Sequence, residues 1–466
     1  MNICRAIPAA IVGAFFTALA LADPLPEPLV SFSSDLSDAY SSLERGFAVD
    51  ASGATVPAAY VLLWSESRQA NVLWVTDGTP EGTHPASQTN VNNALGSLIV
   101  ADDLGAFFAG YTAETGRQIF RTNGPADSAR ALTNEPSGIS FMVGLVDGLP
   151  VISRRAEAGN TAFFSVDPDS GGLSELATVP GLYPQWIATR HAGFAISSVT
   201  KEQITSFRTD GSAPTVLPVP PPDTYWIAPH AMGAGTVLMC LKALTQYSES
   251  DSEMELYCSD GSAEGTRRPV PPFQTTGVHL LDNVEFYPIG DRILFPARAK
   301  PFGSLTLWIT DGSDAGTMPL YNPGVETSVP CTDDRSGGIY FVGSDYGTGS
   351  FQGFLGYTDG TPQGTRQVVP LASGDASCGR LGTSLNQNGL TYLQLGRTLY
   401  RSDGTAAGTA PISAAPAMHG SNVDDGRSHG IVALGRWLVF LAPTSSSDAG
   451  LWRLDLDPIF SGGFDD

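Results

Sequence analysis

The sequence predicts an all-β fold made from one supersecondary unit that is repeated along the chain. A hairpin signature, with an aromatic residue three positions before an Asp-Gly-Thr turn, returns every 43 to 52 residues. The segments between turns alternate apolar and polar residues, and no window shows the period of a helix. A β-forming repeat with a period in the forties indicates propeller blades, so we expect a single β-propeller of eight or nine four-stranded blades.

The turns fall into five well-preserved and four degraded copies. The turn aspartates of the good copies are Asp77, Asp260, Asp311, Asp359 and Asp403, and the degraded copies have Asn123, Asp167, Asp210 and Asp455 at this position. An Asp side chain can accept hydrogen bonds from N–H groups two residues on, and Gly takes the positive φ that a tight turn requires. We interpret these residues as structural turn formers rather than catalytic groups.

Each repeat is interpreted as four short strands. The second strand is the clearest and is expected at residues 60–64, 106–110, 149–153, 236–241, 293–297, 339–343, 390–395 and 437–442. The third strand ends at the turn residue, and a fourth follows it, for example at 266–270 and 365–370.

A large aromatic residue stands three positions before nearly every turn residue. The series is Trp74, Phe120, Phe164, Phe207, Tyr257, Trp308, Tyr400 and Trp452, and Gly356 interrupts it. Adjacent sheets need bulky side chains to fill the space between their faces, so these residues are predicted to be core. A ring of aromatics that stack on a ligand is the alternative.

The final repeat stops after its third strand. The segment Pro28–Ser33 precedes the first recognisable repeat and could supply the missing fourth strand, which would join the two ends of the ring and remove exposed sheet edges. Nine third strands imply up to nine blades. Eight blades remain possible if one repeat is degenerate, and the repeat at residues 163–176 is the weakest by sequence.

Both ends of the chain carry segments outside the repeats. Residues 1–22 have one positive charge, an apolar run and a closing Ala-Leu-Ala, the pattern of a secretory signal peptide. The run is too short for a membrane span, which needs about 20 apolar residues. We expect the repeat domain to cover residues 23–456, with a tail at 457–466, in a protein that is secreted or held at the cell surface.

Four cysteines remain after the signal peptide. An even number in an oxidising compartment favours two disulfides, and the strand positions favour the pairs Cys240 with Cys258 and Cys331 with Cys378. The other two connectivities stay open. A zinc site is the rival interpretation, but the sequence has no CxxC pair and no clustered histidines.

The net charge of -22 with three lysines argues against nucleic acid and anionic membranes as partners, because both require a basic surface. We expect a monomer without a membrane span, whose partner is a protein or a carbohydrate.

Acidic pairs recur just before the second strands, at Asp102 and Asp103, Asp333 and Asp334, and Asp424 and Asp425. In a propeller the loops that join strands one and two share a face with those that join strands three and four. Clustered carboxylates suit Ca²⁺, so these six residues are candidate ligands, and no other cofactor is expected. Solvated acidic turns are the alternative.

No sequence motif of a known catalytic site is present. The six histidines are scattered singly and are interpreted as surface or core residues rather than ligands: His84, His191, His230, His279, His419 and His429. A polysaccharide-active propeller, a glycosidase or lyase, would need two carboxylates that converge in its channel, for which Asp102, Asp333 or Asp424 are candidates.

The turn motif, over residues 60–455, is similar to the ELWxSDGTxxGT repeats of exported bacterial proteins. This resemblance implies a β-propeller, mostly without an assigned activity. Pro125 and the shortened segment 211–215 depart from the pattern and put the regularity of those blades in doubt. The ending DPIFSGGFDD also looks like a sorting or processing tag of exported Gram-negative proteins, with a disordered acidic terminus as the alternative.

The loops between strands two and three vary most, at residues 65–71, 111–118, 242–255 and 344–352. Variable loops on a rigid scaffold usually carry the binding surface. We therefore expect a non-catalytic binding or interaction module, with a polysaccharide-active enzyme and a purely structural surface protein as the alternatives.

Overall fold

A computed structural model describes most of the repeat region. The described residues are 25–32, 36–49, 52–86, 98–101, 105–112, 116–124, 129–135, 139, 141–182, 184–188, 191–197, 204–218, 225–227, 239–246, 253–270, 279–280, 286–297, 306–321, 326–330, 338–345, 352–372, 384–387, 390–412, 415–417, 431–443 and 449–456. Their regular structure is all-β apart from one 3₁₀ turn at Glu157–Gly159, and no helix among them is long and apolar enough to cross a membrane.

The described strands form nine four-stranded antiparallel sheets, numbered here along the chain. Sheet 1 holds β2 (Leu36–Val49), β3 (Thr55–Ser65), β4 (Ala70–Thr76) and β5 (His84–Pro85). Sheet 2 holds β6 (Leu98–Ala101), β7 (Gly105–Thr112), β8 (Gly116–Thr122) and β9 (Arg130–Ala131). Sheet 3 holds β10 (Phe141–Val146), β11 (Leu149–Arg155), β12 (Thr161–Val166) and β13 (Leu173–Val179).

Sheet 4 holds β14 (Gln185–Ala188), β15 (Gly193–Ile196), β16 (Ile204–Phe207) and β17 (Thr215–Leu217). Sheet 5 holds β18 (Tyr225–Ile227), β19 (Met239–Gln246), β20 (Glu253–Ser259) and β21 (His279–Leu280). Sheet 6 holds β22 (Tyr287–Ile289), β23 (Arg292–Ala297), β24 (Thr306–Thr310) and β25 (Met318–Tyr321).

Sheet 7 holds β26 (Glu326–Pro330), β27 (Ile339–Asp345), β28 (Gln352–Thr358) and β29 (Arg366–Pro370). Sheet 8 holds β30 (Ser384–Gln387), β31 (Leu390–Leu395), β32 (Thr398–Ser402) and β33 (Ala410–Pro411). Sheet 9 holds β34 (Ile431–Leu434), β35 (Trp437–Pro443), β36 (Ala449–Asp455) and, from the other end of the chain, β1 (Glu27–Ser31).

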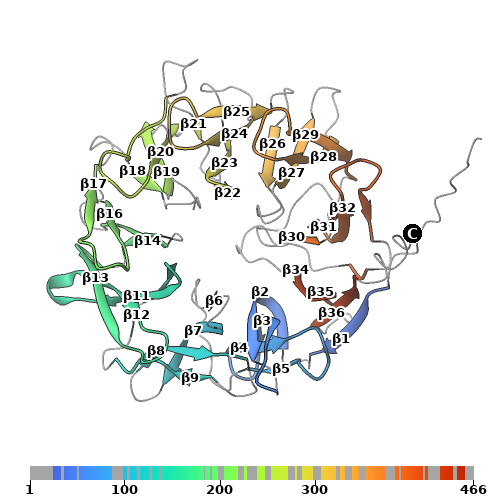
Figure 1. Cartoon of the computed structure of the whole chain (residues 1–466), viewed down its shortest axis with the longest axis horizontal. Helices are drawn as coiled ribbons and strands as arrows, with labels where there is room; N and C mark the ends of the chain where they lie inside the picture. The colour runs from blue at the N-terminus through green and yellow to red at the C-terminus, as the bar shows by residue number, and fades with distance from the viewer. Residues whose placement is uncertain are drawn as a thin grey trace, which may run out of the picture.

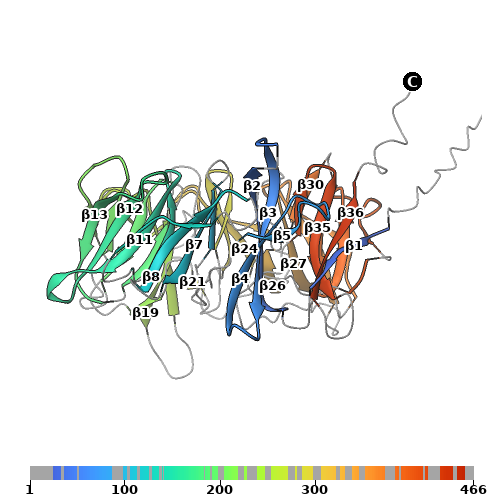
Figure 2. The ribbon, with the colours of Figure 1, turned by 90° about the horizontal axis from the view of Figure 1, so that it is seen from below.

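The sheets are arranged radially around a common axis (Figure 1), as the propeller prediction requires. In the side view the strands run between the two faces of a disc (Figure 2). Each sheet therefore presents its first and third connections at one face and its second connection at the other. The strands β1 and β36 lie side by side in both views and pair antiparallel from Glu27 opposite Arg453 to Ser31 opposite Gly450.

The core lies between successive sheets. The cluster that joins sheets 5 and 6 contains Leu256 from β20, Ile293 and Phe295 from β23 and Trp308 from β24. Clusters of the same kind join sheets 1 and 2, 2 and 3, 3 and 4, 6 and 7, 7 and 8, 8 and 9, and 9 and 1. Middle strands such as β12 and β24 are buried along their whole length because both of their faces pack against a neighbouring sheet.

The aromatic series before the turns is confirmed as core for seven of its eight members, and Tyr257 is partly buried. Phe120, Phe164, Phe207, Trp308 and Tyr400 are buried in clusters with the preceding sheet, and Trp74 and Trp452 are partly buried against such clusters. Gly356 replaces the aromatic residue in β28. Its cross-strand partner Phe341 fills the space, since a Cβ atom on Gly356 would lie 2.3 Å from Cζ of that ring.

One strand prediction was wrong. The segment 266–270 is not the fourth strand of sheet 5: only an isolated bridge joins Cys258 to Arg267, and β21 at His279–Leu280 completes the sheet. Prolines at 269, 271 and 272 explain the failure, because proline has no N–H to donate to a ladder. The segment 163–176, the weakest repeat by sequence, contributes most of β12 and of β13 to the four-stranded sheet 3.

Replacing Trp308 by Ala should lower the free energy of unfolding by about 3 to 5 kcal/mol, because the side chain is fully buried between sheets 5 and 6. Val216→Ala is the control, since Val216 is 56% exposed and should change stability little. Denaturant unfolding followed by tryptophan fluorescence and circular dichroism measures both. Equal midpoints for the two variants would show that Trp308 is not a core residue.

Candidate functional site

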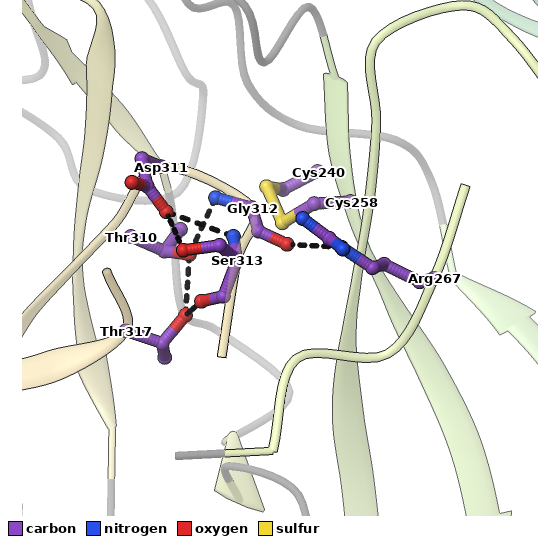
Figure 3. The surroundings of a disulfide bond; sticks show 8 residues. All are labelled: Cys240, Cys258, Arg267, Thr310, Asp311, Gly312, Ser313 and Thr317. Carbon is purple, nitrogen blue, oxygen red and sulfur yellow. Dashed lines mark hydrogen bonds between the residues drawn. A yellow bond between two sulfur atoms is a disulfide. The ribbon is translucent and has the colours of Figure 1, made fainter. Parts of the chain in front are cut away.

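The five good turns share one hydrogen-bond network, which Figure 3 shows for the turn after β24. Oδ1 of Asp311 accepts the backbone N–H of Ser313 at 2.8 Å and its hydroxyl at 2.6 Å. The Ser313 hydroxyl accepts the N–H of Gly316 at 2.9 Å, and the Ser313 carbonyl accepts the Thr317 hydroxyl at 2.6 Å. Equivalent bonds surround Asp77, Asp260, Asp359 and Asp403. The turn aspartates are thus confirmed as turn formers.

The residue before each good turn aspartate completes the network. The Thr310 hydroxyl accepts the N–H of Gly312 at 2.9 Å and lies 2.7 Å from the Thr317 hydroxyl, which begins the return strand. The same pair of contacts is made by Thr76, Ser259, Thr358 and Ser402. This hydroxyl connects the end of the third strand to the start of the fourth, a role that the sequence pattern alone did not predict.

Steric constraints explain why glycine occupies both glycine positions of the motif. Gly312 has φ +84°, which side chains rarely adopt. Gly316 faces the turn carboxylate, and a Cβ atom there would lie 2.0 Å from Oδ1 of Asp311. The turn therefore closes over its own aspartate, and the carboxylate is occupied by its own loop.

The turns also dock on the preceding sheet. A Cβ atom on Gly78 would lie 2.8 Å from Cδ1 of Trp437 in sheet 9, and one on Gly124 would lie 2.3 Å from Cβ of Ala48 in sheet 1. The N–H of Val49 donates to the carbonyl of Asn123 at 2.7 Å. The first glycine of the turn is thus needed for the contact between sheets as well as for the turn.

Arginine side chains stabilise several of these contacts by hydrogen bonds to turn carbonyls. Nε of Arg267 donates to the carbonyl of Gly312 at 2.9 Å (Figure 3), and Nη2 of Arg366 donates to that of Gly404 at 3.0 Å. Nη1 of Arg453 donates to the carbonyl of Gly78 at 2.9 Å. In each case the arginine belongs to one sheet and the turn to the next, so these side chains are structural.

The buried disulfide between Cys240 and Cys258 is confirmed and joins β19 to β20. Figure 3 places it beside Arg267, whose backbone pairs with that of Cys258. The second predicted pair, Cys331 and Cys378, lies outside the described residues.

The six candidate calcium ligands Asp102, Asp103, Asp333, Asp334, Asp424 and Asp425 lie outside the described residues, so the calcium hypothesis stays a prediction. The same holds for the channel carboxylates of the enzyme alternative. Within the described ranges, no three His, Cys, Asp or Glu side chains are grouped so that they could hold a metal ion.

His191 lies at the surface, one of the two environments expected for it, and has a carboxylate partner from another sheet. Its Nδ1 lies 2.9 Å from Oδ1 of Asp147, and Oδ2 of Asp147 accepts the Thr209 hydroxyl at 2.9 Å. Asp147 lies in the first connection of sheet 3, whereas His191 and Thr209 lie in the first and third connections of sheet 4. The cluster confirms that these two kinds of connection share a face. Sequence spacing gave no signal for it because 44 residues separate the partners.

The opposite face carries the loops between the second and third strands. In the loop at 65–71, residues 66–69 are exposed, and the other three variable loops lie partly outside the described residues. A pocket opens on this face at the junction of sheets 3 and 4, and its lining consists of Phe141, Ser153, Arg155, Thr161, Leu182, Pro184 and Trp186. The room for the centre of a water molecule is about 20 Å³, which suits a small polar group rather than a whole sugar ring.

No protein-family model matches the chain, and no curated protein matches it. Among solved structures, it is similar to the WD40 domain of SCAP from fission yeast, with 10% identity over 79% of this chain and 95% of that chain at a TM-score of 0.38. It is similar to the β-propeller domain of the Trilobed protease from Pyrococcus furiosus, with 13% identity over 68% and 95% at 0.34. It is also similar to puromycin hydrolase, with 15% identity over 86% and 58% at 0.38. At these values the likenesses carry no information on the site.

The turn network makes the stability of the fold depend on pH. The hydroxyl and backbone N–H of Thr361 hold the pKa of Asp359 below its usual value, so the stabilisation is complete above about pH 4 and is lost as the pH falls through the lowered pKa. Thr361→Val should lower the melting temperature at pH 7 and reduce its further fall at pH 3. Thr361→Ser, which keeps the hydroxyl as in Ser262 and Ser313, should behave as the wild type. Thermal melts at both pH values test this, and identical pH dependence in all three proteins would refute it.

Proposed function

We propose that the protein is an exported, nine-bladed β-propeller that acts as a non-catalytic binding module through the face with the loops between the second and third strands. The observation that carries this proposal is the different use of the two faces. On the turn face, the repeated side chains are engaged in turns and in contacts between sheets. On the opposite face, the loops differ from repeat to repeat and a pocket opens among them.

The nine-blade ring is inferred from the way the chain ends meet. Leu29 and Phe32 at the N-terminal end pack with Val61 and Val72 of sheet 1 and Val439 of sheet 9. This junction, together with the pairing of β1 and β36, supports a ring that closes through a sheet built from both ends of the chain.

Arg453 lies at the centre of this junction. Its Nε donates to Oε1 of Glu27 at 2.7 Å, its guanidinium lies 4.1 Å from the centre of the Trp437 ring, and its Nη1 reaches the carbonyl of Gly78. One side chain thereby contacts β1, its own sheet and sheet 1. This arrangement supports closure by the N-terminal strand.

Export is inferred from the sequence of residues 1–22. The buried disulfide supports the proposal because such bonds persist in oxidising compartments. The similarity of the turns to the ELWxSDGTxxGT repeats of exported proteins agrees with it.

If β1 closes the ring through Arg453, Arg453→Ala should loosen the N-terminal strand. The expected result is a lower melting temperature and earlier proteolytic cleavage near β1, seen by mass spectrometry of the fragments. Arg436→Ala is the matched control, because Arg436 also lies over Trp437, at 4.8 Å, but pairs with Asp455 of its own sheet. Cleavage that begins elsewhere and equally in both variants would contradict closure.

The binding proposal is tested with the chain 23–466 on immobilised neutral and acidic oligosaccharides, with an assay for newly formed reducing or unsaturated ends. We expect retention of the protein without release of product. Product formation would support the polysaccharide-active alternative. Absence of retention on every sugar, together with absence of a captured protein partner, would favour a structural role and overturn the proposal.

A further inference from the structure

The pocket at the junction of sheets 3 and 4 combines a cation with aromatic and hydroxyl side chains. Arg155 is exposed, and its side chain forms no hydrogen bond or ion pair within the described part of the chain. Its neighbour Arg154 differs, since it pairs with Glu135 and lies 4.4 Å from the centre of the Phe164 ring. Other arginines are also neutralised by carboxylates, for example Arg121 by Asp169. Within the described residues, Arg155 therefore presents at the pocket wall a guanidinium that no carboxylate neutralises.

The surroundings of Arg155 favour an anion. None of the seven lining residues is acidic. A second guanidinium, that of Arg117, lies 5.7 Å from the centre of the Phe141 ring, which forms part of the pocket wall. Glu157, which lies in the turn that follows β11, is not part of the lining. The planar guanidinium of Arg155 can bind a carboxylate through two parallel hydrogen bonds.

The size of the pocket decides how much of a ligand enters it. About 20 Å³ of room for the centre of a water molecule accommodates one small charged group, so the remainder of the ligand must lie outside. Phe141 and Trp186 at the wall are only partly buried, and Tyr111, at the end of β7 on the same face, is 68% exposed. Aromatic faces next to a charged recess suit a rigid ring that carries one carboxylate. An extended peptide would instead require a row of backbone partners.

We propose that this pocket binds the carboxylate of an acidic oligosaccharide through Arg155, with the sugar ring against Phe141 and Trp186. The inference rests on the binding role proposed above and names its ligand class. Ser153, which is buried, and Thr161 contribute hydroxyl-bearing residues to the wall. The Thr161 hydroxyl is already committed to the carbonyl of Gly181 at 2.9 Å, so Arg155 carries the recognition of charge.

The test uses isothermal titration calorimetry of the chain 23–466 with a galacturonic acid tetramer at low salt, and with the methyl-esterified tetramer as a neutral probe. We expect binding of the acid that weakens with rising salt, and at least tenfold weaker binding of the ester. Arg155→Ala should weaken binding of the acid at least tenfold. Arg130→Ala removes an exposed arginine of β9, away from the pocket, and should leave binding unchanged.

The variants test the Arg155 pocket independently of the general binding role. Equal affinity of wild type and Arg155→Ala for the acid would overturn this pocket while leaving the binding role intact. Equal binding of a short poly-glutamate peptide in an Arg155-dependent manner would overturn the assignment to a sugar. Absence of binding to the tetramer would also overturn the inference, and the retention assay on the wider panel then decides separately whether the protein is a binding module. Matching circular dichroism and melting temperatures of the variants establish that the fold is unchanged.

Discussion

The contact between the glycine-containing turns and the preceding sheets is the constraint on which the rest of the structure depends. A sheet of four short strands cannot bury both of its faces alone, so its stability comes from the neighbours that cover them. The turn glycine allows the close approach at positions such as Gly78 and Gly124, and arginines such as Arg267 and Arg366 hold the turn carbonyls. The repeated motif is therefore both the end of a hairpin and the joint between sheets. This double role explains why the same few residue types return in every good copy.

Because the turns make the contacts between sheets, the two faces of the molecule have different roles. Carboxylates at the good turns accept hydrogen bonds from their own loops, and the carbonyls beside several of them face arginines of the neighbouring sheet. The repeated polar groups of the described turns on that face therefore already have partners. The second connections point the other way and take no part in this network, so their sequences can change without loosening the array. The pocket with Arg155 lies among them, and the proposed binding role follows from this separation.

The sequence predicted the turn aspartates and the aromatic series because each depends on residues close together in the chain. The hydroxyl before each turn aspartate was visible in the same pattern, as Thr76, Ser259 or Thr310, but its role needed the position of the returning strand. The pair of His191 and Asp147 and the pocket at Arg155 could not be predicted. Their partners come from different sheets, and no repeated spacing marks residues that meet only once in the molecule.

The sequence by itself determined the all-β class, the repeat and the chemistry of the turns, since these follow from local backbone preferences and from the alternation of residues along a strand. It favoured the pairing of Cys240 with Cys258, which the structure decided. Only the tertiary structure decided which residues of neighbouring sheets face one another. In the structure Phe341 lies over Gly356, and His279–Leu280 rather than 266–270 forms the fourth strand of sheet 5. Arg155 has no acidic partner among the described residues. The physical reason is that contacts between sheets depend on the rotation and stacking of whole units, and a periodic sequence specifies the unit without specifying what lies between one unit and the next.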